Sequence, residues 1–233
     1  MVPSNKKFFP VIHVKNRRQA LKNALLAYEA GSDGLFLINH ENEDGIRELD
    51  FRRLLDIHSY VTKHMPSWFV GVNCLDLPAR EVFQHLNPSV AAVWADNAEI
   101  DERSEAHPEA EQILAAKTKS GWRGQYFGGV ASKYQRPIAN HQLAASIGQN
   151  YMDVVTTSGP STGQAASIQK IQDMKQAIQP APLAIASGIT AKNVNQFLPW
   201  VDYFLVATGI SRSFYQLDPV KTKELAQIIH QSL

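Results

Sequence analysis

Short apolar runs rich in valine, isoleucine and phenylalanine recur along the chain, and each run ends in small or polar residues. Runs of this length and composition predict buried β-strands. Apolar residues within the runs are continuous rather than alternating, which is typical of parallel strands covered by helices on their outer side. The eight runs are Phe9–Val14, Gly34–Asn39, Trp68–Cys74, Ala91–Ala95, Gly124–Gly129, Met152–Thr157, Pro182–Ala186 and Tyr203–Thr208.

The segments between these runs carry apolar residues at a spacing near 3.6, which predicts amphipathic helices. Gly31 follows the first such segment and indicates where that helix ends. Three prolines stand where later helices are expected to begin, since proline is favoured in the first turn of a helix: Pro78, Pro108 and Pro219. The chain therefore alternates predicted strands and helices.

Eight strand–helix units in 233 residues average about 29 residues each, which fits a (β/α)8 TIM barrel of about 250 residues. An open doubly wound α/β sheet is the alternative. It is less favoured because Lys15-Asn16-Arg17 follows the first run, where a dinucleotide-binding sheet has Gly-x-Gly-x-x-Gly. The polar segment Asn97–Ala110 fits an extended loop after the fourth strand rather than a linker. We expect an α/β fold with one TIM-barrel domain over residues 1–233.

The composition of the chain argues against several classes of partner and site. Lysine and arginine number 23 against 22 aspartate and glutamate, so the net charge of +1 gives no overall field that recruits nucleic acid or an anionic membrane. The single cysteine, Cys74, excludes an intrachain disulfide and a multi-thiolate metal site. No apolar run approaches the ~18 residues of a membrane helix. We expect a cytoplasmic protein with neither a nucleic-acid nor a membrane partner.

The candidate reactive residues directly follow the runs, because TIM-barrel active sites lie at the carboxyl ends of the strands. Asp96 is the best-placed carboxylate for acid–base chemistry, His13 can carry a proton near neutral pH, and Lys133 can hold a phosphate or a carboxylate. Structural roles remain open for all three: a loop cap, a hydrogen-bonded scaffold and a solvated lysine. Asn39 and Asn73 can bind ligand hydroxyls or amides.

The last three runs each lead into a serine or threonine followed by glycine, namely Ser158-Gly159, Ser187-Gly188 and Thr208-Gly209. Glycine lets backbone N–H groups approach an anion closely, and the loops after strands seven and eight are the usual phosphate site of this architecture. Tight-turn formation is the alternative reason for these glycines. A small phosphorylated or anionic ligand is the expected partner.

Two further features of the sequence, a possible metal site and an acidic segment, give weaker indications of function. A metal site from His13, His40 and Asp96 is weakly supported because no His-x-x-x-His spacing accompanies them, and the sequence identifies no cofactor. The acidic residues after the fourth run are expected to form a solvated face. They are Glu99, Asp101, Glu102, Glu105, Glu109 and Glu111.

Several segments resemble the BtpA-like barrels of the ribulose-phosphate-binding type. The resemblance implies a TIM barrel and phosphate binding. The family often has an acidic residue before the asparagine that ends strand two, where this chain has Ile38, and acidic and histidine residues on strand five, where it has Gly129 and Ala131. The segments that carry the resemblance are Ala30–Gly34 running to Asn39, Gly71–Leu75, Lys133 before Pro137, Asp153–Gly159 with Thr162-Gly163, and Ser187–Thr190 with Asn193-Val194.

The sequence is compatible with two functions. The first is an enzyme that acts on a phosphorylated sugar or a phosphoribosyl-type metabolite. The alternative is a noncatalytic BtpA-like barrel that binds a small anionic ligand and assists the assembly or regulation of a partner, which the missing acidic residues favour. A homo-oligomer is compatible with both functions.

Overall fold

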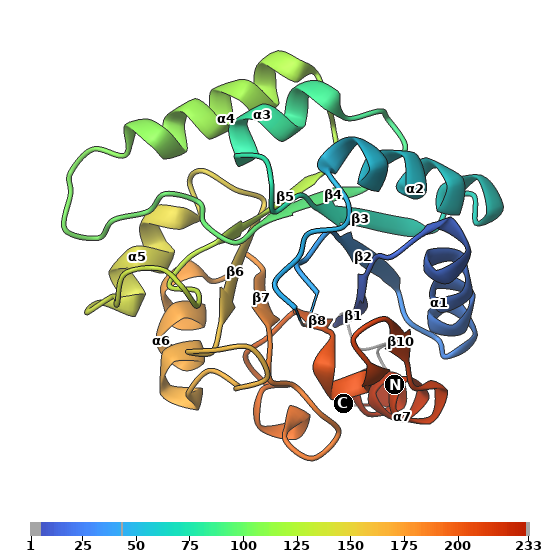
Figure 1. Cartoon of the computed structure of the whole chain (residues 1–233). Helices are drawn as coiled ribbons and strands as arrows, with labels where there is room; N and C mark the ends of the chain where they lie inside the picture. The colour runs from blue at the N-terminus through green and yellow to red at the C-terminus, as the bar shows by residue number, and fades with distance from the viewer. Residues whose placement is uncertain (1–5, 43, 232–233) are drawn as a thin grey trace.

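The computed structural model describes residues 6–42 and 44–231, and its eight main strands form a closed parallel barrel (Figure 1). Each predicted run overlaps one of these strands, which confirms the TIM-barrel fold. Strand β1 pairs with β8, with Phe8 opposite Phe204, so the sheet has no open edge. The strands are β1 (Lys7–His13), β2 (Gly34–Ile38), β3 (Phe69–Asn73), β4 (Ala92–Ala95), β5 (Gln125–Gly129), β6 (Val154–Ser158), β7 (Leu183–Ala186) and β8 (Tyr203–Val206).

Helices cover the outside of the barrel, and their ends follow the sequence signals (Figure 1). Gly31 follows the first helix with a left-handed φ of 86°, and Pro108 and Pro219 begin two later helices. No helix among the described residues is long and apolar enough to cross a membrane. The helices are α1 (Arg17–Glu29), α2 (Phe51–His64), α3 (Ala79–Val82), α4 (Pro108–Ser120), α5 (His141–Gly148), α6 (Ile168–Ile178) and α7 (Pro219–Gln231).

Two connections differ from a regular alternation of strands and helices. Between β7 and β8 the chain forms only the 3-10 turn η2 (Val194–Gln196) in place of the expected α-helix. After β8 it forms the 3-10 turn η3 (Thr208–Ile210) and then a small antiparallel hairpin, β9 (Ser211–Ser213) with β10 (Gln216–Leu217), which the sequence did not predict. This hairpin contributes a residue to the mouth of the barrel.

The interior of the barrel is filled by aromatic side chains. The rings of Phe9 and Phe69 stack at 4.8 Å between centroids, and those of Phe36 and Phe127 meet edge to face at 5.2 Å. Gly71 makes room for this cluster, because a Cβ at that position would lie 2.4 Å from a ring carbon of Phe36. The packed interior leaves ligand space only at the ends of the strands.

The segment after β4 corrects the expectation of a solvated acidic face at Glu102. That side chain is only 4% exposed, and the guanidinium of Arg136 donates to both of its carboxylate oxygens. The backbone N–H of Ala139 donates to the same carboxylate at 3.1 Å. Arg136 also pairs with Asp101 at 2.8 Å. These contacts fasten the β4α4 loop to the β5α5 loop beside the mouth of the barrel.

Candidate active site

A cavity of about 120 Å³ lies at the carboxyl ends of the strands. Residues from distant parts of the chain line it, because successive parallel strands all end at this mouth. The predicted site residues that the structure brings together here are His13, Asp96, Lys133, Ser187 and Thr208. The remaining lining residues are Val11, Ile38, His40, Trp94, Thr162, Gly163, Leu205, Ala207 and Phe214.

His13 is held by the hairpin that follows β8. Its ring stacks on the ring of Phe214 at 4.1 Å between centroids, and its Nδ1 lies 3.0 Å from the backbone carbonyl of Phe214. A carbonyl only accepts hydrogen bonds, so Nδ1 carries the proton and Nε2 is left as an acceptor. Burial, aided by the nearby His40 and Lys133, lowers the pKa of His13 to about 4. The imidazole is therefore neutral around pH 7.

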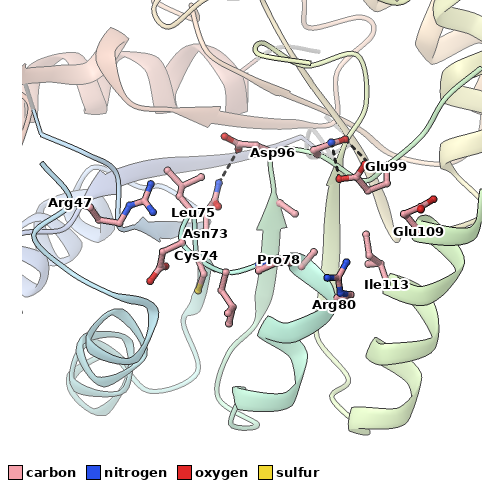
Figure 2. A pocket seen from close by; sticks show the side chains of 15 residues that line it. Arg47, Asn73, Cys74, Leu75, Pro78, Arg80, Asp96, Glu99, Glu109 and Ile113 are labelled. Carbon is pink, nitrogen blue, oxygen red and sulfur yellow. Dashed lines mark hydrogen bonds between the residues drawn. The ribbon is translucent and has the colours of Figure 1, made fainter. Parts of the chain in front are cut away.

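Asp96 is fixed from two sides at the end of β4. The side-chain amide of Asn73 donates to its carboxylate at 3.0 Å, as Figure 2 shows, and Nε2 of Gln135 donates to its backbone carbonyl at 2.6 Å. Asn73 is only 1% exposed, so it acts here as a positioning residue for Asp96. No pattern in the sequence pointed to Gln135, which lies in the loop after β5.

Lys133 brings a positive charge to the cavity. Its backbone N–H donates to Oγ of Ser158 at 2.7 Å, and its ammonium donates to Oγ1 of Thr162 at 3.0 Å. No carboxylate of residues 6–42 or 44–231 forms an ion pair with it. An anionic ligand group would thus meet a charge that the protein does not neutralise.

The glycines of the last three loops serve backbone packing. A Cβ on Gly159 would lie 2.0 Å from the carbonyl oxygen of Gln164, one on Gly188 2.0 Å from the backbone nitrogen of Ala165, and one on Gly209 1.9 Å from the carbonyl oxygen of Ile189. The contacts of Gly188 and Gly209 each join two neighbouring loops, whereas that of Gly159 lies within the loop after β6, and all three are at distances that only glycine permits. Ser187 and Thr208, which precede the last two of these glycines, both line the cavity.

Asn39 and Ser158 make their hydrogen bonds within the protein. The amide nitrogen of Asn39 donates to Asp76 at 2.5 Å and to the carbonyl of Leu49 at 3.2 Å, while its oxygen accepts from the N–H of Leu75 at 2.8 Å. Asn39 thereby joins the loops after β2 and β3. Ser158 accepts from the N–H of Lys133 and, with Gly159, lines a neighbouring cavity rather than the mouth itself.

A larger cavity of about 670 Å³ adjoins the mouth and is drawn in Figure 2. Asp96 lines both cavities, so it lies where they join. Arg47 enters the larger cavity from the loop after β2, and its buried Nε has no hydrogen-bond partner among the described residues. Cys74 also lines it, but burial raises the pKa of the thiol to about 12 and keeps it protonated. The larger cavity thus offers a guanidinium and carboxylates to a polar ligand.

The rings of His13 and His40 lie 5.4 Å apart between centroids, close to Asp96 in the lining of the mouth. In the part of the chain that the structure describes, no three histidine, cysteine, aspartate or glutamate side chains form a group that could hold a metal ion.

The chain is similar in sequence to one protein family and to two archaeal proteins. The sequence profile of the BtpA family matches residues 96–232. An uncharacterised protein of Archaeoglobus fulgidus is 23% identical over 205 residues, which cover 83% of this chain and 81% of that protein. An uncharacterised protein of Pyrococcus horikoshii is 24% identical over 125 residues, which cover 52% of this chain and 48% of that protein.

Solved structures with the same fold are distant in sequence. Phosphoribosyl anthranilate isomerase of Thermus thermophilus superposes with a TM-score of 0.64 at 14% identity, covering 94% of this chain and 96% of that one. (S)-3-O-geranylgeranylglyceryl phosphate synthase of Thermoplasma acidophilum, solved in complex with sn-glycerol-1-phosphate, gives 0.62 at 15% identity and covers 97% of this chain and 94% of that one. At these identities the likeness establishes the barrel fold.

Proposed function

Because the chain belongs to the BtpA family, and its barrel mouth gathers acid–base and anion-binding groups, we propose that it is an enzyme acting on a phosphorylated sugar or phosphoribosyl-type metabolite. The observation that carries the proposal is the convergence of His13, Asp96 and Lys133 with Ser187 and Thr208 on one cavity. The isomerase and the synthase with the same fold are named for phosphorylated compounds, which supports the ligand class.

The smaller cavity is the place for the phosphate group. Its volume of about 120 Å³ is below the ~300–1,000 Å³ of sites that enclose a whole small-molecule ligand. Ser187 and Thr208 supply hydroxyl donors, and Lys133 supplies the charge. A phosphate fits these groups because it combines a compact size with several acceptor oxygens.

The carbon chain of the substrate passes Asp96, at the point where the larger cavity joins the mouth. This carboxylate, oriented by Asn73, is placed to take a proton from the substrate or to return one. The neutral His13 presents Nε2 to the mouth as a second proton acceptor. The reaction class is therefore a proton transfer on a phosphorylated, hydroxylated carbon chain.

Turnover and binding of a panel of sugar phosphates, measured together, test this function. Asp96→Asn is expected to lower turnover by ~100-fold or more and to retain stabilisation by the ligand, since the phosphate groups stay in place. Asp56→Asn removes the same charge from the exposed face of α2 and is the matched control. Equal turnover in wild type and Asp96→Asn would remove Asp96 from the chemistry.

A noncatalytic barrel that binds a small anionic ligand is the second candidate function. It is favoured by the ends of β2 and β5, which lack the acidic residues that the family often has there. Ile38 is 3% exposed and packs in the apolar interior. Gly129 has no room for a side chain, since a Cβ there would lie 2.1 Å from the carbonyl oxygen of Asp96. Neither strand end offers a carboxylate at these positions. Ligand-induced stabilisation without product across the whole panel would favour this candidate over the enzyme.

A further inference from the structure

A third cavity, of about 590 Å³, opens between the β5α5 and β6α6 loops, next to the mouth of the barrel. Every charged side chain that lines it is basic: Lys133, Arg136 and Lys170, with His141 beside them. None of its lining residues is an aspartate or glutamate. A cavity with this lining has an electrostatic preference for anions.

Two of these basic groups are not neutralised by the protein. Arg136 is paired with Asp101 and Glu102, whereas neither Lys133 nor Lys170 forms an ion pair with any carboxylate of the described residues. Lys133 lines both this cavity and the mouth, so the two cavities share one positive charge. An anion in the third cavity would therefore lie beside the proposed phosphate position.

Lys170 is the half-buried cation of the third cavity. Its ammonium donates to the carbonyl of Ala131 at 2.5 Å and to that of Ser158 at 2.7 Å. An ammonium has three donors, so one remains for a ligand. Burial lowers the pKa of Lys170 to about 8, and no carboxylate of the described residues pairs with the ammonium to offset this desolvation. A bound anion would supply that compensation.

We propose that the third cavity is a second anion subsite, which binds a phosphate or carboxylate group at the far end of the same substrate. The inference rests on the proposed function, because it takes the phosphate in the mouth as the first anion. It narrows the substrate class to compounds with two anionic groups, one on each side of Lys133. Lys170 and Lys133 are the groups that recognise the second one.

Two probes of different charge number test the subsite, followed through backbone amide signals in ¹H–¹⁵N NMR titrations. Ribose 5-phosphate is expected to shift amides of the mouth, among them Ser187 and Thr208, and to leave the amides of Ala166, Ser167 and Lys170 unchanged. Ribulose 1,5-bisphosphate is expected to shift the amides of Ala166, Ser167 and Lys170 as well, and to bind about tenfold more tightly, as one added charge-assisted hydrogen bond implies.

Variants of Lys170 test whether this residue causes the tighter binding of the bisphosphate. Lys170→Met is expected to remove the advantage of the bisphosphate while leaving the affinity for ribose 5-phosphate unchanged, and Lys170→Arg, which keeps the charge, is expected to retain it. Lys223→Met makes the same change on the exposed face of α7 and is the matched control. Should Lys170→Met not fold, the comparison of the two probes on wild type and Lys170→Arg decides.

The outcomes separate the subsite from the proposed function. If the bisphosphate binds no more tightly than ribose 5-phosphate and shifts only the amides of the mouth, the second subsite is rejected and the proposed function stands. If Lys170→Met weakens both probes equally, Lys170 only holds the two loops together, and the subsite is again rejected. If neither probe binds, both proposals are rejected.

Discussion

The buried histidine of α2 makes the stability of the barrel depend on pH in a way that can be measured without knowing the substrate. His58 is fully buried, and burial lowers its pKa from 6.5 to about 4. Its Nε2 lies 3.0 Å from the carbonyl of Val70, so Nε2 carries the proton. Its Nδ1 is buried without a hydrogen-bond partner among the described residues.

The direction of the effect follows from proton uptake. The unfolded chain protonates this histidine near pH 6.5, whereas the folded chain does so only near pH 4, so the unfolded state binds more protons between these values. Stability is therefore lost as the pH falls through that window. Between about pH 7 and about pH 5, the protonation of His58 in the unfolded chain lowers the free energy of unfolding by about 2 kcal/mol.

Replacing His58 by leucine removes this loss. The carbonyl of Val70 keeps a partner, because the N–H of Ala91 donates to it at 3.0 Å, and the unpaired Nδ1 disappears. We expect His58→Leu to be within about 1 kcal/mol of wild type at neutral pH, or more stable than wild type. Its drop in stability on acidification is expected to be about 2 kcal/mol smaller than that of wild type.

Urea unfolding at the two pH values gives these free energies by linear extrapolation. His64→Leu is the matched control, since it makes the same substitution at an exposed position of the same helix and is expected to keep the wild-type dependence on pH. An equal drop on acidification in wild type and His58→Leu would show that the buried imidazole does not control the acid sensitivity, and would refute the reasoning.

Two further predictions concern the mouth. Asn73→Leu removes the donor to Asp96, so turnover is expected to fall by about tenfold with little change in the affinity for ribose 5-phosphate. Steady-state kinetics and a binding titration measure the two quantities, and an equal loss in both would contradict the positioning role. Gly209→Ala places a Cβ 1.9 Å from the carbonyl of Ile189, so it is expected to lower the melting temperature without ligand, and an unchanged thermal scan would contradict the packing role.

The barrel was predictable from the sequence because each of its strands is buried on both faces. Such strands give a continuous apolar run, and the run is visible without any tertiary information. The connection from β7 to β8 was not predictable in this way. Its 3-10 turn η2 takes the place of a helix within a short segment. Local spacing of apolar residues does not distinguish that turn from the start of a helix.

The contacts that define the site were less predictable, because they join residues far apart in the chain. His13 and Phe214 are 201 positions apart, and their stacking depends on the hairpin after β8. Gln135 reaches Asp96 across 39 positions. Sequence reasoning found the polar residues at the strand ends through the architecture of the barrel, but it could not find the neighbours that orient them.

The serine or threonine followed by glycine in the last loops shows how two explanations of one motif combine. The sequence left an anion site and a tight turn as alternatives for Ser187-Gly188 and Thr208-Gly209. In the structure Gly188 and Gly209 hold neighbouring loop backbones together, while the hydroxyl residue before each of them lines the cavity. Close packing of the loops thus brings the two hydroxyl residues to the lining of one cavity. A glycine substitution would disturb the loop packing and the proposed anion site at once, so only substitutions of Ser187 and Thr208 separate the proposed ligand binding from folding.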